Sequence, residues 1–312
     1  RARRPDLAAD DAGFLSVDVA APAARSQRGA LALPGWSSRP VLLGDHAHVL
    51  AGGLLWVIDV SDPDAPSLVG STAVGAAVND LARVDAHTLL AGGGDQVSVI
   101  DLTDPAAPVV TGSATVNGLV YGVAARGDLA CATLYHHGLA TLDIADPFAP
   151  AVLDSVDTDG LALAVAMTER YAYVAQGNET NLAVVDLVAP ADLQVVALHE
   201  GLDDAYGITV ADGVAYLAAS WAGCELVDVT DPASPRHLGL LPAPSRVDGL
   251  AVHDGLLLAA DRDGGLLLGP VQCPLVTPAP APAPAALALD AWPNPFNPRV
   301  RFSFALRDDG RA

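Results

Sequence analysis

Three observations predict an all-β fold, namely a β-propeller of six or seven four-stranded blades. A sequence motif, clearest as LWVIDVSDPDAP at residues 55–66, is repeated along the chain at intervals of 41–43 residues. Each interval divides into four short apolar segments, and a four-stranded unit of about 40–45 residues is the length of one propeller blade. The third segment of each unit is apolar on both sides of the pleat, which is expected of a strand covered on both faces by neighbouring blades.

The unit between residues 78 and 113 shows how the strands are assigned. Strands are expected at NDLARV, HTLLAGG, QVSVIDL and PVVTGS. The Gly, Asp and Pro residues between these segments are typical of tight antiparallel turns. Similar segments follow between residues 118 and 156 and between residues 204 and 241. We therefore expect the same order of four strands throughout a propeller at residues 14–271.

The number of blades is left open by the sequence. Seven third strands are expected but only six first and second strands, because the repeat begins in mid-unit at Phe14. Either an upstream half-blade is missing from a ring of seven, or six blades close with strands from both ends. Residues 1–13 are expected to be a disordered or truncated segment. We interpret the chain as a fragment, since it begins with Arg1 and stops within a predicted strand.

An aspartate stands at the centre of six of the seven copies of this motif. Asp59 shares a strand face with Leu55 and Val57, so its carboxylate is expected to be withdrawn from water and to need hydrogen-bond donors. The backbone N–H groups of the next turn can supply them in an Asx-type arrangement. Because the residue recurs from blade to blade, we interpret it as structural rather than catalytic. The repeat aspartates are Asp18, Asp59, Asp101, Asp143, Asp186 and Asp228.

The sequence motif at Val57 to Pro63 resembles the repeat motif of the LVIVD-repeat β-propeller proteins. The resemblance extends over about residues 14–271 and implies the propeller fold. Two copies depart from the pattern: the copy at Asp186 lacks the Asp-Pro turn, and Gly269 takes the place of the aspartate in the last copy.

The composition changes after Val271. Residues 272–286 are rich in Pro and Ala and are expected to form an extended linker. Residues 287–312 contain WPNPFNP at Trp292 to Pro298, followed by the alternation typical of a half-buried strand. This block resembles the beginning of the C-terminal sorting domains of type IX secretion. The resemblance implies a truncated Ig-like β-sandwich, the secretion machinery as a partner, and a protein that is secreted or held at the outer cell surface. An unrelated proline-rich linker is the alternative.

Composition limits the possible partners. The net charge is −21 at pH 7, so the chain repels nucleic acid and anionic membranes, and no nucleic-acid partner is expected. No apolar stretch approaches the roughly 18 residues that span a bilayer, so no transmembrane segment is expected in this fragment. Of the three cysteines, Cys131 and Cys224 lie in predicted strands and are expected to be buried thiols. The sequence leaves open a disulfide between any two of them.

No motif for catalysis, a metal or a cofactor is found. HExxH, GxSxG, the P-loop and the EF-hand loop are all missing. The adjacent His136 and His137 point to opposite sides of an extended chain, which disfavours their joint ligation of one metal ion. We therefore expect no catalytic residue, no metal and no cofactor.

The mouth of the central channel is the best candidate for a binding surface. First strands line the axis of a propeller, and the loops between second and third strands are expected on the same face as the loops that enter the first strands. A concave mouth with a few polar groups is a usual binding place. The competing interpretation is that the tyrosines fill the channel and the acids are merely solvated. The candidate residues are Asn79, Asp80, Tyr121, His136, His137, Tyr206, Trp221, Asp248 and Arg262.

These features favour a non-enzymatic binding or scaffold module, expected to be a monomer, whose partner is a protein or glycan at the cell surface. The alternative is a secreted hydrolase or lyase that acts on polysaccharide at the axial mouth, for which Asp80 and Asp248 are the nominated pair of carboxyl groups. A third possibility is that the propeller is accessory to an activity elsewhere in the parent protein. The sequence identifies neither a ligand nor a substrate.

Overall fold

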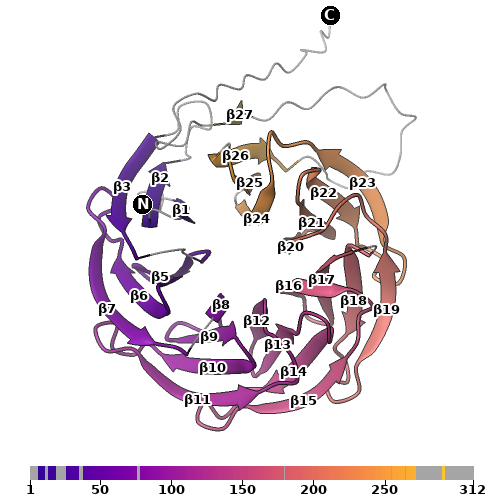
Figure 1. Ribbon diagram of the computed structural model, residues 1–312, viewed down its shortest axis with the longest axis horizontal. Coiled ribbons are helices and arrows are strands. Elements are labelled where there is room, and N and C mark those ends of the chain that lie inside the picture. The colour runs from indigo at the N-terminus through magenta and orange to yellow at the C-terminus, as the bar shows by residue number, and fades with distance from the viewer. Residues whose placement is uncertain are drawn as a thin grey trace, which may run out of the picture.

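A computed structural model of the chain describes residues 6–10, 13–18, 26–34, 38–75, 78–178, 180–253, 255–263, 265–271 and 290–291. Within these residues, antiparallel sheets stand side by side in a ring around a central opening (Figure 1). Six of the sheets have four strands each, hydrogen-bonded in the order of the chain, and the first sheet has three. The prediction of an all-β propeller with four-stranded blades is confirmed.

Within each sheet, the strands follow one another in chain order from the inside of the ring to the outside (Figure 1). The three-stranded sheet contains β1 (Asp6–Asp10), β2 (Gly13–Asp18) and β3 (Ser26–Ala32). The first three blades are β4 (Val41–Leu43), β5 (His46–Ala51), β6 (Leu54–Asp59) and β7 (Ser67–Ala73); β8 (Val78–Arg83), β9 (Thr88–Gly93), β10 (Gln96–Asp101) and β11 (Val109–Thr115); and β12 (Val123–Arg126), β13 (Leu129–Thr133), β14 (Leu139–Asp143) and β15 (Ala151–Val156). The last three are β16 (Leu161–Met167), β17 (Tyr171–Gly177), β18 (Leu182–Asp186) and β19 (Gln194–His199); β20 (Ile208–Ala211), β21 (Val214–Ala219), β22 (Gly223–Asp228) and β23 (Arg236–Leu241); and β24 (Val247–His253), β25 (Leu256–Asp261), β26 (Gly265–Pro270) and β27 (Asp290–Ala291).

The three-stranded sheet lies between the first and the last four-stranded blades. On one side, Phe14 of β2 packs with Val49 of β5. On the other side, Val17 of β2 packs with Leu258 of β25. Within the described residues, the ring is therefore closed by six four-stranded blades together with a three-stranded sheet, in which β2 carries the repeat aspartate of a third strand.

The apolar third strands are buried on both faces, as the sequence predicts. In β6, the side chain of Leu55 packs with Leu89 of the following blade. Ile58 of the same strand packs with Phe14 of the preceding sheet. Leu55 and Ile58 are both fully buried. Because each face of the strand meets another sheet, an alternation of apolar and polar residues would leave polar groups without water.

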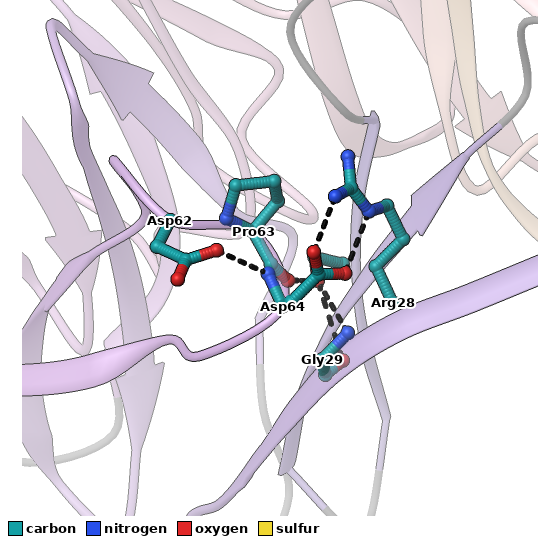
Figure 2. Close-up of polar contacts among 6 residues, drawn as sticks. Arg28, Gly29, Asp62, Pro63 and Asp64 are labelled. Atoms are coloured by element: carbon teal, nitrogen blue, oxygen red, sulfur yellow. Dashed lines mark hydrogen bonds and ion pairs between the residues drawn. The ribbon is translucent and has the colours of Figure 1, made fainter.

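In several blades the turn after the third strand packs against the outermost strand of the preceding sheet. Figure 2 shows the turn that follows β6, where the Asp62 carboxylate accepts a hydrogen bond from the Asp64 N–H at 3.0 Å. Asp64 forms an ion pair with Arg28 of β3, with Nε to Oδ1 at 2.7 Å. Beneath it, the Ser16 hydroxyl donates to the Pro63 carbonyl oxygen at 2.5 Å. The Asp-Pro turn of the repeat is therefore a contact between blades as well as the end of a strand.

Glycines in the outermost strands make room for these turns. A Cβ atom on Gly70 of β7 would lie 2.5 Å from the carbonyl oxygen of Pro105 in the next blade. The same atom on Gly112 of β11 would lie 2.6 Å from the Pro147 carbonyl oxygen. Each glycine follows its repeat aspartate by eleven residues. A side chain on Gly70 or Gly112 would push the two blades apart, whereas the β12–β15 and β16–β19 blades accommodate Asp154 and Ala197 at the same position of the repeat.

Two segments near the ends differ from the sequence-based expectation. Residues 1–13, expected to be disordered or truncated, contain β1, because Asp6–Asp10 pairs with the edge of β2. Asp290–Ala291 was assigned to the sorting domain but pairs with β26 as the outermost strand of the last blade. The local sequence indicates neither partner. The rest of the expected linker and sorting block, residues 272–289 and 292–312, lies outside the described residues.

The described residues include no helix that is long and apolar enough to cross a membrane. Cys131 and Cys224 are buried free thiols, as expected. Burial raises the pKa of each thiol to about 12, which disfavours the reactive thiolate. Cys273 is outside the described residues.

Candidate binding site at the axial mouth

One face of the ring is built from the two kinds of loop that the sequence places together. The loop between the second and third strands of a blade bonds to the chain that enters the next blade. Tyr135 accepts a hydrogen bond at its carbonyl from the Ala162 N–H at 2.8 Å, and Ser220 accepts one from the Val247 N–H at 3.0 Å. The innermost strands surround the central opening (Figure 1). We call the surface formed by these loops at the opening the axial mouth.

An aromatic group belongs to the β12–β15 blade. The ring of Tyr121 stacks on that of Tyr135, with centroids 4.8 Å apart and planes 19° from parallel. His136 meets Tyr135 edge to face at 4.3 Å. His136 and His137 are both exposed, and Tyr121 is 36% exposed. The structure therefore joins Tyr121 to His136 through Tyr135, a residue that the sequence prediction did not include.

Tyr135 occupies a left-handed backbone position that Gly94 fills in the preceding blade and Ser220 fills in the β20–β23 blade. Its φ is 55°, in the left-handed region, where residues other than glycine are uncommon. In the β8–β11 blade the corresponding inter-blade hydrogen bond is accepted by Gly94, with φ 58°. An aromatic residue at this position costs of order 1 kcal/mol in backbone strain relative to glycine. Tyr135 is half-buried, and its ring supports the exposed Tyr121, so an aromatic side chain held at that cost favours a role in binding over one in folding.

A second group lies across the junction of the last two blades. The Arg246 guanidinium lies 4.0 Å from the ring centroid of Tyr206, a cation–π distance. Asp248 of β24 pairs with Arg246 at 2.5 Å and lies 3.6 Å from Arg262 Nε. Tyr206, Asp248 and Arg262 are thus brought together as a set. The sequence analysis did not include Arg246, which contacts both Tyr206 and Asp248. Its position two residues before Asp248 places it on the same side of the extended chain, and this spacing could have identified it.

Trp221 lies in the loop between β21 and β22, next to Ser220, whose carbonyl bonds to Val247 of the second group. Trp221 is 65% exposed, which makes it one of the most exposed large apolar residues in the described part of the chain. The backbone is fixed nonetheless, because the Trp221 N–H donates to Asp203 Oδ2 at 3.1 Å. An exposed indole on a fixed backbone loses little freedom when it is covered by a ligand.

Asn79 and Asp80 of β8 are engaged within the fold. The Asn79 amide donates to the Val120 carbonyl oxygen at 2.6 Å. The Asp80 carboxylate accepts from the Val123 N–H at 3.1 Å and lies 3.5 Å from Arg39. Burial raises the pKa of Asp80, and the Arg39 charge and the Val123 hydrogen bond offset this only in part. These two side chains connect neighbouring blades.

The nominated carboxyl pair is not brought together by neighbouring strands. Asp80 belongs to β8 and Asp248 to β24, and these strands lie on opposite sides of the central opening (Figure 1). Each carboxylate is also paired with an arginine.

The repeat aspartates lie at the third-strand turns and not at the axial mouth. Asp59 Oδ1 accepts a hydrogen bond from the Ser61 N–H at 2.8 Å, the Asx-type contact to the residue two positions later. The same contact, at 2.8–3.0 Å, is made by Asp101, Asp143, Asp186 and Asp228. The side chain of Asp18 is outside the described part of the chain.

The expectation that these carboxylates are withdrawn from water is met fully by Asp228 and in part by the half-buried aspartates, and it was wrong for Asp143. Asp228 is buried, at 2% exposure. Asp59 is only half-buried, and Asp143 is exposed. Each aspartate is the last residue of its strand, where the neighbouring blade no longer covers the chain.

The family model for the LVIVD repeat matches residues 35–74, 117–158, 159–197 and 203–239, together just over half of the chain. No curated protein matches. Among solved structures, the chain is similar to BamB from Moraxella catarrhalis (14% identity, TM-score 0.58, 83% of this chain and 78% of that one) and to Sqt1 from Saccharomyces cerevisiae (10%, 0.63, 83% and 77%). It is also similar to the computationally designed Ika8 protein (12%, 0.63, 87% and 82%). At these identities the likeness shows the fold alone.

Proposed function

The chain belongs to the LVIVD repeat family, and we propose that it is a binding and scaffold module whose axial mouth holds a protein or glycan partner. The observation that carries the proposal is the display of aromatic side chains on fixed backbone at this mouth. Trp221 is 65% exposed, and Tyr121 presents an exposed ring stacked on Tyr135. Rigid aromatic side chains supply large contact area at low entropic cost, and they dominate many binding surfaces.

The charged groups at the mouth add directional contacts to this apolar surface. Arg246 lies over Tyr206 while pairing with Asp248, so the ring and the carboxylate are held in place together. Aromatic faces next to polar groups suit a sugar ring or a peptide segment equally. The net charge of −21 disfavours a polyanionic partner such as nucleic acid.

We further propose that the protein acts outside the cell. The support is the resemblance of Trp292 to Pro298 and the following residues to the start of a type IX sorting domain. Removal of the chain from residue 287 onwards should retain the protein inside cells that otherwise export it, as measured by immunodetection on intact and lysed cells. Equal surface labelling with and without this segment would contradict export through it.

The test of the binding proposal compares Tyr121→Ala and Trp221→Ala with the unchanged protein on a glycan array and against purified cell-surface proteins. Each substitution should weaken binding about tenfold or more, because central aromatic contacts are typically worth more than 1 kcal/mol. The matched control is Phe148→Ala. Phe148 is 74% exposed and lies in the turn between third and fourth strands, on the opposite face. Unchanged binding of both mouth variants to every partner found would refute the proposal.

A further inference from the structure

A cluster of two histidines and a glutamate lies outside the axial mouth, at the junction of the β16–β19 and β20–β23 blades. His237 Nδ1 is 2.9 Å from Glu225 Oε1, and His199 Nε2 is 3.4 Å from the same oxygen. The three ligand atoms all lie within 4.8 Å of one another. Glu225 belongs to the third strand of its blade, and the histidines belong to the outermost strands of the two blades.

The three residues depart from the repeat at three different positions. The residue three places before the repeat aspartate is Glu225 in this blade, and in the preceding four blades it is Trp56, Ser98, Ala140 and Ala183. Nine places after the aspartate stands His237, where those blades have Leu68, Val110, Val152 and Val195. Thirteen places after the aspartate of its own blade stands His199, where other blades have Thr72, Ala114, Val156 and Leu241. The blade fold needs none of the three side chains.

Burial makes the cluster costly as well as unusual. The side chain of Glu225 is 1% exposed, that of His199 is 11% exposed and that of His237 is 44% exposed. The second carboxylate oxygen, Glu225 Oε2, accepts a hydrogen bond from the Leu202 N–H at 3.3 Å, so Oε1 is the oxygen that faces the two imidazole nitrogens. A buried carboxyl group is costly unless it has such partners.

We propose that His199, Glu225 and His237 form a binding site for a divalent transition-metal ion, with zinc as the preferred ion. Two imidazole nitrogens and one carboxylate oxygen are a usual donor set for zinc. Ligand atoms about 2.0–2.1 Å from a tetrahedral ion are about 3.3 Å apart. The two separations to Glu225 Oε1 are 2.9 and 3.4 Å, and the two imidazole nitrogens lie within 4.8 Å of each other, so a small rotation of one imidazole completes the set. The exposed side of His237 leaves the fourth position of the ion open to water or to a ligand atom of a partner.

Direct binding of Zn²⁺, and of Co²⁺ as a spectroscopic probe, to the full chain tests the proposal. One equivalent of Zn²⁺ should remain after dialysis, and Co²⁺ should give the visible absorption of a tetrahedral site. His199→Gln and His237→Gln should each weaken Zn²⁺ binding about a hundredfold or more, since even the outer partners of metal ligands contribute 10–100-fold. The matched control is the double variant His136→Gln/His137→Gln, which removes the exposed pair and should leave this binding unchanged.

A measurement on the unchanged protein covers the case in which a variant fails to fold. In ¹⁵N spectra, Zn²⁺ should shift Nε2 of His199 and Nδ1 of His237, the nitrogens that face Glu225. Absence of a retained equivalent of Zn²⁺, its loss in the His136/His137 variant, or shifts confined to other histidines would overturn the proposal.

Discussion

The glycine beneath an inter-blade turn offers the sharpest test of how the repeats hold together. In Gly70→Ala, the new Cβ atom would lie 2.5 Å from the carbonyl oxygen of Pro105 and 2.8 Å from that of Ala106. Both are backbone atoms, so the two blades must move apart. Overpacking of this kind costs about 1–3 kcal/mol. In a domain of this size, each kcal/mol lowers the Tm by about 2–4 °C.

The chain provides a matched control at the same place in the repeat. Gly239 also follows its repeat aspartate by eleven residues, but a Cβ atom there would meet nothing within 4 Å. Gly239→Ala should therefore leave stability unchanged or raise it by up to about 1 kcal/mol, because alanine restricts the unfolded chain. Urea unfolding and thermal melting of both variants measure the difference. Equal stability of Gly70→Ala and Gly239→Ala would refute the idea that the turn of the next blade requires glycine at position 70.

Two further predictions concern pH. Burial lowers the pKa of His48 from 6.5 to about 4, so the unfolded chain binds the proton more tightly, and stability should fall by up to about 3 kcal/mol as the pH drops from 6.5 to 4. His48→Leu, which introduces the residue type that β9 carries at the corresponding position (Leu90), should remove that fall in urea unfolding between pH 7 and 4.5; an identical pH dependence would contradict it. Hydrogen bonds from the Thr230 hydroxyl and N–H, together with Arg236, hold the pKa of Asp228 below its ordinary value, so its stabilisation is present above about pH 4 and is lost as the pH falls through the folded-state pKa. Asp228→Ala should cost about 1–3 kcal/mol at pH 7 and less below pH 4, whereas the exposed Asp143→Ala should cost under about 1 kcal/mol; equal losses for the two variants in urea unfolding would show that burial of the carboxylate is irrelevant.

The sequence was sufficient for the four-stranded blade and its repetition, though not for the number of blades, because its evidence is periodic. A blade is a local unit of about 42 residues, and both the Asx turn at Asp59 and the two-sided burial of Leu55 and Ile58 follow from residues within one unit. Even the spacing of Gly70 from its aspartate was present in the sequence. The reason for this spacing could not be inferred from the sequence, because the atoms that exclude a side chain at Gly70 belong to the next blade.

The tertiary structure decided which neighbour each side chain meets. The repeat places Asp80 and Asp248 at comparable positions, yet the fold ties the first to Arg39 and Val123 and the second to Arg246 and Arg262. His199 and Glu225 are 26 residues apart and belong to different blades, so no motif spacing joins them. The sequence by itself determined the repeated unit, since hydrophobic period and turn chemistry are local. Only packing of one blade on the next brought His199 to Glu225 and Tyr206 to Arg246, because these are contacts between units that each look complete alone.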